Sequence, residues 1–182
     1  HLDYVILDDF DYSKDFIPVA KRNALDRWIL SRVSSVAENY HDQYVSWEFH
    51  KAARELENFV INDLSNWYVR RSRRRLWDEA ESHDKRACQF TLHEVLLTVS
   101  KLMAPIAPFM PDKIHFDLTG TSVHTADWPL GSDLVDKNLP PQDLVLEKEM
   151  SIVRMLAETG RKIRVEAKRR QRLPCKEGWI VG

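Results

Sequence analysis

The sequence is poor in the residues that build disulfide frameworks, metal centres and glycine-rich loops. Its 182 residues include only 2 cysteines and 5 glycines. Cys88 and Cys175 lie far apart, and neither a Cys-x-x-Cys nor a His-x-x-x-His spacing occurs. The pattern therefore predicts no disulfide framework and no metal site. A reducing, cytoplasmic setting is expected from this cysteine usage. No apolar run approaches about 18 residues, so no membrane-spanning segment is expected.

Charge is balanced in total but unevenly distributed. Lysine and arginine number 27 and aspartate and glutamate 28, for a formal net charge of -1. The first fifteen residues are acidic, whereas the runs at 70–75 and 161–176 are basic. Local patches, rather than the total, determine the field that a polyanion meets. A near-neutral protein of this kind can therefore still bind nucleic acid.

Hydrophobic residues make up 43% of the chain and recur at helical spacing over most of it. The i, i+3, i+4, i+7 pattern predicts long helices over 18–41, 46–77, 85–103 and 143–167, and a short one over 112–118. The third stripe includes Cys88 as a small buried hydrophobe and leaves His93 facing solvent. In the short helix, Ile114 and Leu118 point inward. Short connections between long helices favour antiparallel neighbours, so the fold class is an all-α antiparallel bundle.

The domain organisation follows from these stripes and from the proline-rich break near Pro140. Trp179 to Val181 reads as the start of a strand, which predicts a truncated β-containing module at the C-terminus. The expected parts are a connecting segment (1–17) that continues a larger protein, a helical bundle (18–130), a linker (131–142), and a basic helix with the start of the next module (143–182).

Two details of the second long helix concern the placement of its basic end. Residues 41–45 are expected to form a short turn, with Ser46 as the N-cap of the helix. Asp63 falls inside the apolar stripe, and an unpaired buried carboxylate is costly. We expect Asp63 to be paired with the Trp67 indole or with a basic group of the preceding helix, such as Arg22.

The basic end of this helix is a dense run of arginines beside aromatic residues. At 100° per residue, Arg70, Arg71 and Arg74 continue the apolar stripe, and Arg73 and Arg75 flank it. Guanidinium groups suit phosphates, and aromatic rings suit unstacked bases, so the combination favours RNA binding. Alternatively the chain is a helical scaffold, in which the arginines pair internally with carboxylates. In that case Arg71 and Arg74 would be inaccessible.

The amino-acid sequences of two stretches resemble a known family. Asp63 to Trp77, together with Leu25 to Ser31, is similar to the anticodon-binding domain of isoleucyl-tRNA synthetases of the archaeal and eukaryotic type, which some bacteria share. Residues 102–109 and 122–129 extend the resemblance, which covers 22–129 well and 143–175 more weakly. The related valyl and leucyl synthetases remain an alternative, but the sequence from Asn66 to Arg71 favours the isoleucyl synthetases.

The resemblance implies a parent enzyme that joins isoleucine to its tRNA with ATP and Mg²⁺. The family's His-x-Gly-His motif, its Lys-Met-Ser-Lys-Ser loop and a glycine-rich phosphate cradle are all missing from this sequence. We therefore expect no catalytic residue, cofactor or metal in this chain; ATP and Mg²⁺ belong to the parent. The implied partners are the isoleucine tRNA and the catalytic and C-terminal domains of the same parent chain, not DNA or a membrane.

Two basic groups supply the expected tRNA contacts, with Trp67, Tyr68 or Trp77 as possible stacking platforms. The second group lies on the last helix and continues beyond its end. The predicted tRNA-binding residues are Asn66, Trp67, Arg70, Arg71, Arg73, Arg74 and Arg75 in the first group, and Arg161, Arg164, Lys168 and Arg172 in the second.

Overall fold

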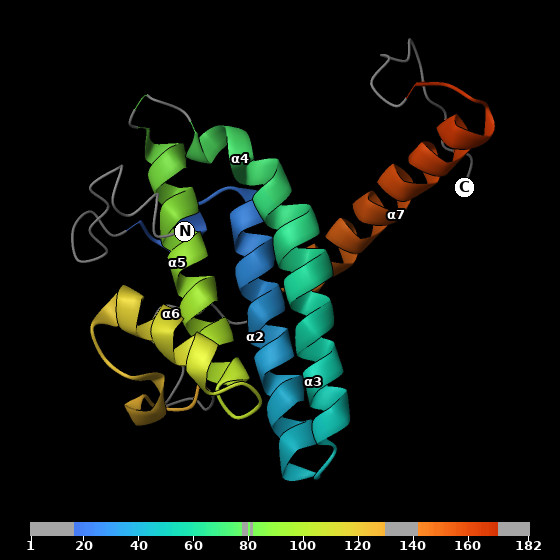
Figure 1. Ribbon diagram of the computed structural model, residues 1–182. Coiled ribbons are helices and arrows are strands. Elements are labelled where there is room, and N and C mark those ends of the chain that lie inside the picture. The colour runs from blue at the N-terminus through green and yellow to red at the C-terminus, as the bar shows by residue number, and fades with distance from the viewer. Residues whose placement is uncertain (1–16, 78–79, 81, 130–141, 171–182) are drawn as a thin grey trace. The chain divides into compact units, whose positions relative to one another are not determined.

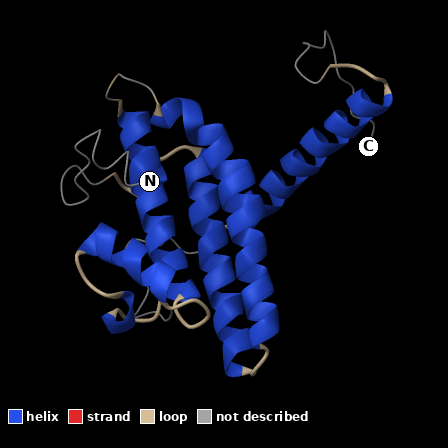
Figure 2. Ribbon diagram, viewed as in Figure 1, coloured by secondary structure: helices blue, strands red, loops and turns tan. Residues whose placement is uncertain are grey.

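The structure is a computed structural model that describes residues 17–77, 80, 82–129 and 142–170. Every regular element in these ranges is a helix (Figure 2), as expected for an all-α fold. The chain divides into two compact units, His1–Leu144 and Val145–Gly182. None of the helices in the described ranges is long and apolar enough to cross a membrane. The strand expected at 179–181 and most of the expected linker lie outside the described residues.

A short 3-10 helix, η1 (Val19–Lys21), leads into α2 (Ala24–Val45), the central helix of the first unit. The Asn23 side chain caps α2 by accepting a hydrogen bond from the backbone amide of Asp26. Figure 1 shows α2 between α3 and α5, and it packs on both. This position explains why its apolar stripe, from Trp28 to Tyr40, is buried.

The connection after α2 differs from the sequence prediction. The helix continues through 41–45, and Ser46 ends it by donating its backbone N–H to the Asp42 carbonyl. Ser46 is thus not the N-cap of the next helix; Glu48 holds that position. The chain reverses at Trp47, whose φ of 61° lies in the left-handed region. The prediction was wrong because the polar residues 41–43 were read as a turn, although they lie on the outer face of a continuing helix.

The second long helix is confirmed, but it is not α-helical throughout. It consists of α3 (Phe49–Asn58), the π-helix η2 (Phe59–Val69) and α4 (Arg70–Leu76), without a break. Because a π turn closes by i→i+5 hydrogen bonds, it holds more residues than an α turn and shifts the phase of the residues after it. The buried positions after Trp67 are therefore Tyr68, Ser72 and Leu76.

The helix α5 (His83–Met103) begins after Ser82, whose hydroxyl accepts from the Lys85 amide at 3.1 Å. It is buried on nearly every side, including His93, which is only 5% exposed. The expectation that His93 faces solvent was therefore wrong. A one-sided stripe describes a surface helix, whereas α5 packs on α2, α4 and α6.

The helix α6 (Phe109–Thr119) starts three residues before the predicted Asp112. Pro111 is compatible with this start because the first turn of a helix makes no use of its N–H groups. Pro111 and His115 are the buried residues, and Ile114 and Leu118 are half-buried rather than fully inside. Gly120 ends α6 at φ 76°, and a 3-10 helix, η3 (Val123–Thr125), follows.

In the second unit, α7 (Leu144–Glu166) matches the predicted helix 143–167 closely. None of its residues is buried, and apolar side chains such as Ile152, Val153 and Ile163 are about half exposed. A Cβ added at Gly160 would meet no described atom within 4 Å.

Burial of His93 generates a prediction about stability and pH. Desolvation lowers the pKa of His93 to about 4, against about 6.5 for an unfolded histidine. As the pH falls, the unfolded state takes up the proton first, so stability is full above pH 6.5 and is lost between 6.5 and 4. His93→Gln, which does not titrate, should reduce this loss by about 2–3 kcal/mol.

Urea unfolding at pH 7 and pH 4.5 measures the effect, with His124→Gln as the control because His124 is exposed. Equal losses of stability in the wild type and in His93→Gln would show that His93 is not the titrating group.

Candidate nucleic-acid interface

Four of the five arginines between 70 and 75 face solvent. They are Arg70, Arg71, Arg73 and Arg74, and all lie on α4. They escape burial because the π-helix places Ser72 and Leu76 on the packed side instead. In the described part of the chain, neither the Arg70 nor the Arg74 guanidinium forms a hydrogen bond or an ion pair. The result is a cationic surface on α4.

Arg71 is held by the aromatic residue one turn before it. Its guanidinium carbon lies 3.1 Å from the centroid of the Trp67 ring. Trp67 itself is 6% exposed. The indole therefore packs in the bundle and supports Arg71 by a cation–π contact, rather than offering a free face to a base. This placement contradicts the use of Trp67 as a stacking platform.

The accessible indole in this region belongs to Trp77, which is 65% exposed. The Arg73 guanidinium carbon lies 5.5 Å from its ring centroid. Tyr68, the third candidate platform, is fully buried. Of the three aromatic residues considered from the sequence, only Trp77 has a ring that a base could reach.

Arg75 differs from its neighbours because it is a structural residue. Its two terminal nitrogens donate to the two carboxylate oxygens of Asp26 at 2.9 and 2.7 Å. Its Nε donates to Asp84 at 2.6 Å. Burial lowers the pKa of the Arg75 guanidinium, but the hydrogen bonds to Asp26 and Asp84 outweigh burial and raise the pKa above its ordinary value. The prediction that Arg75 binds tRNA is therefore withdrawn, since its donors are occupied.

The Asp26 carboxylate, which is 0% exposed, is the centre of this network. The Tyr68 hydroxyl donates to it at 2.7 Å and lies 3.4 Å from the Cys88 sulfur. Burial is the main cause that raises the pKa of the Tyr68 hydroxyl well above its usual range, and the neighbouring Cys88 and Asp26 add to the effect. The hydroxyl therefore stays protonated and remains a donor. Burial also raises the pKa of the Cys88 thiol.

Sequence reasoning missed the role of Asp26, although one signal was available. Asp26 lies two residues before Trp28, the first residue of the apolar stripe of α2, and a carboxylate buried with that stripe needs a cation. Its partner is 49 residues away in sequence, and helical periodicity carries no information about such pairs.

Asp63 is buried at 4% exposure and paired, as expected, with a base from the preceding helix. The partner is Arg32, whose Nε lies 3.3 Å from the carboxylate. It is not Arg22, whose guanidinium instead donates to Glu94 at 3.0 Å and to Thr91 at 3.1 Å. The Asp63–Arg32 pair ties α2 to η2 just before the arginine run.

The remaining predicted residues fall in different places. Asn66 is exposed on η2, four residues before Arg70. On α7, Arg161 is exposed and Arg164 half-buried, and Lys168 is exposed just after the helix ends. Arg172 lies outside the described residues. The residues of the second group belong to the second unit, so they are described by themselves.

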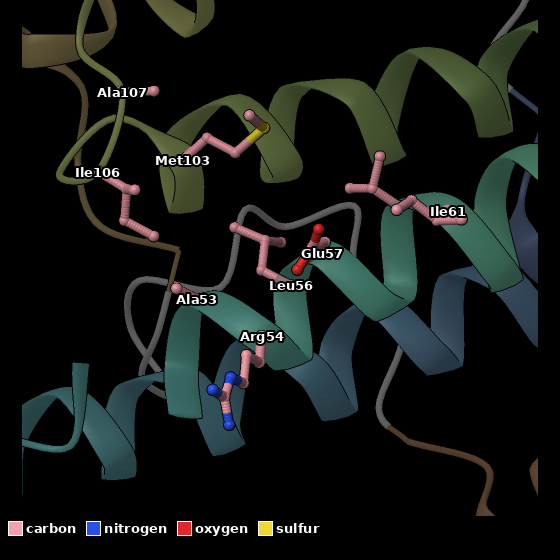
Figure 3. A pocket seen from close by; sticks show the side chains of 9 residues that line it. Ala53, Arg54, Leu56, Glu57, Ile61, Met103, Ile106 and Ala107 are labelled. Carbon is pink, nitrogen blue, oxygen red and sulfur yellow. The ribbon is translucent and has the colours of Figure 1, made fainter. Parts of the chain in front are cut away.

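Little in the described residues points to catalysis. No cluster of histidine, cysteine, aspartate or glutamate there could hold a metal ion. A pocket of about 350 Å³ lies between α3, η2 and the end of α5 (Figure 3). Its lining includes the apolar side chains of Leu56, Ile61 and Met103, with Arg54 and Glu57 as its charged groups. This lining lacks the paired nucleophile and base that catalysis needs.

Comparison with known proteins gives a consistent result. The family described as "Anticodon-binding domain of tRNA ligase" matches residues 26–178. The chain is 39% identical over 174 residues to the isoleucine–tRNA ligase of Bacillus thuringiensis strain Al Hakam, covering 96% of this chain and 16% of that protein. It is also 39% identical over 181 residues to the isoleucine–tRNA ligase of Methanothrix thermoacetophila, covering 95% and 17%.

A third relative is the isoleucine–tRNA ligase of Porphyromonas gingivalis, 48% identical over 128 residues, with 69% of this chain and 11% of that protein covered. The chain thus spans about a sixth or less of the length of the relatives it matches.

The Asp26 network predicts two different responses to the loss of a carboxylate. Asp26→Asn removes the buried partner of Arg75 and should destabilise the bundle by about 3 kcal/mol, because it leaves a partly buried cation undercompensated. Asp84→Asn removes a carboxylate whose side chain is 54% exposed, so its cost should stay below about 1 kcal/mol. Chemical unfolding of both variants at pH 7 measures the difference. Equal costs would contradict the central role of Asp26.

Proposed function

The chain belongs to the family of anticodon-binding domains of tRNA ligases, and from this premise we propose that it binds the anticodon stem and loop of an isoleucine tRNA. The observation that carries the proposal is the exposed arginine surface on α4, formed by Arg70, Arg71, Arg73 and Arg74. Such a surface provides phosphate contacts, and the exposed Trp77 indole adds one ring on which a base can stack.

The scaffold alternative requires arginines that are paired internally and inaccessible. Arg71 and Arg74 were the residues that discriminate between the two interpretations, and both are exposed. Arg75 matches the scaffold description, through Asp26 and Asp84. The exposed arginines therefore support a binding surface, and Arg75 fixes the orientation of the helix that carries it.

The proposal of an isoleucine tRNA rests on relatives named isoleucine–tRNA ligase and on the sequence from Asn66 to Arg71. The parent enzyme attaches isoleucine to tRNA with ATP and Mg²⁺, acts in the cytoplasm, and carries catalytic and C-terminal domains that contact this one. The chain itself binds without catalysing, because its sequence contains neither the His-x-Gly-His nor the Lys-Met-Ser-Lys-Ser motif.

Binding to two tRNA transcripts tests the proposed function. One transcript has the isoleucine anticodon, and the other is identical except for a changed anticodon. The chain should bind the first more tightly, and each phosphate contact should add about -0.7 to -0.9 to the slope of log K against log salt. Equal affinity for both transcripts would limit this domain to sequence-independent RNA binding, and the absence of binding would favour the scaffold.

Arg74→Ala tests the arginine surface directly. The substitution should weaken binding of the intact transcript roughly tenfold at low salt, since a charge-assisted contact is lost. It should also make the slope of log K against log salt less negative by about 0.7 to 0.9, the contribution of one phosphate contact. Because Arg74 is exposed and has no partner in the described part of the chain, the thermal unfolding midpoint should fall by less than about 4 °C, the most that loss of a cation from the last helical turn would cost.

The matched control is Lys51→Ala, which removes an exposed cation from α3, at the far end of the same continuous helix. An Arg74→Ala affinity no lower than that of Lys51→Ala would remove Arg74 from the site.

A further inference from the structure

Five polar residues spaced by four form one line along the second long helix. They are Asn58 at the end of α3, Asn62 and Asn66 in η2, and Arg70 and Arg74 in α4. All five are exposed. We call this set the amide–arginine line. It extends the arginine surface backwards along the helix with neutral amides.

The π-helix keeps these five residues on the same side. In an α-helix of 3.6 residues per turn, each step of four residues advances the direction by about 40°, so a line of five would wind around the helix. A turn closed by i→i+5 bonds holds more residues, so a step of four falls short of a full turn. The forward rotation per step in the α-helical part and the backward rotation per step in the π-helical part therefore partly cancel. Phe59, Asp63 and Trp67, each one position after an asparagine of the line, are buried.

Helix stability does not account for the choice of asparagine at three exposed positions. Asparagine is among the poorer helix formers, because its side chain competes for backbone groups. Two of these amides are aligned with each other: Asn62 Nδ2 donates to Asn58 Oδ1 at 2.6 Å. Each amide has two donor hydrogens and an acceptor oxygen with two lone pairs, so a single hydrogen bond uses only part of the capacity of an amide.

The line is neutral in its middle and has charged residues near both ends. Near Asn58, the exposed Arg54 and Glu57 carry opposite charges. Arg70 and Arg74, at the other end, attract phosphates. Neutral amides suit neutral groups that both donate and accept hydrogen bonds. In RNA, the ribose 2′-hydroxyl is such a group, and it distinguishes RNA from DNA.

We propose that Asn58 and Asn62, continuing Asn66, select RNA by hydrogen bonding to ribose 2′-hydroxyls while Arg70 and Arg74 hold the phosphates. This inference rests on the proposed function, because it assumes that α4 binds RNA. It adds a set of specificity residues that is distinct from the cationic residues.

The test compares two probes on the 182-residue chain. One is an RNA stem-loop with the anticodon-arm sequence of an isoleucine tRNA, and the other is the same stem-loop built of deoxyribose. The double variant Asn58→Ala with Asn62→Ala should bind the RNA about tenfold more weakly, the effect of two lost neutral hydrogen bonds. Its affinity for the DNA stem-loop should change less than about twofold, because the amides make no 2′-hydroxyl contact there.

Two further readouts separate this role from a structural one. The salt slope of the double variant should equal that of the wild type, since neutral amides release no counterions. Its helix content and unfolding midpoint should not fall, because alanine is the better helix former. Asn39→Ala is the matched control: it removes an exposed amide on α2 that is bonded to Glu55, and it should leave both affinities unchanged.

The possible results distinguish the failure of this inference from the failure of the proposed function. If the wild type binds the RNA and the double variant binds it equally well, the 2′-hydroxyl role is wrong and the arginine surface stands. If the double variant loses affinity for both stem-loops alike, the amides contact groups common to RNA and DNA, which also overturns the inference. If the wild type binds neither probe, the proposed function fails and this inference fails with it.

Discussion

The buried carboxylate of Asp26 is the constraint on which the orientation of the arginine surface depends. A charge at 0% exposure must be compensated. The compensation comes from Tyr68 in η2 and Arg75 in α4. Because these two residues lie seven positions apart on one helix, anchoring both to α2 fixes the rotation of that helix about its axis. Once Tyr68 and Arg75 face inward, Arg70 and Arg74 face outward.

Chemically identical residues in one run therefore have different roles, which their partners determine. Arg75 is bound by Asp26 and Asp84, and Arg71 is stacked on Trp67. Arg70 and Arg74 extend into solvent. This division explains how a chain with a net charge of -1 presents a cationic surface. Three carboxylates, those of Asp26, Asp63 and Glu94, are buried and pair with arginines inside the bundle, whereas Arg70 and Arg74 remain outside.

The sequence was sufficient to predict where the helices lie. It was insufficient to predict which side of a helix is buried after Trp67 and which charged side chains pair between helices. Stripes such as that of α2, from Trp28 to Tyr40, predicted real buried faces, because burial of one face imposes the period of 3.6. The phase after Trp67 was wrong because the π-helix adds residues to a turn without any change in composition. The same limit applies to His93, whose burial depends on neighbours on several sides of α5. The partners of Asp63 and Arg75 depend on contacts 31 and 49 residues away, which no local pattern encodes.

Helix stability offers a structural explanation of the basic run that competes with the functional one. Cations in the last turn of a helix are favoured by the partial negative charge of its C-terminus, by about 0.3–1 kcal/mol each. Arg73, Arg74 and Arg75 occupy that last turn, so helix stability accounts for part of the run. The dipole effect falls off within one turn, however, so it favours neither the exposed Arg70 nor the amides that precede it. Asn66, a poor helix former exposed on the π-helix, is better explained by a ligand. Asn66 is therefore a stronger indicator of RNA binding than the arginines of the last turn.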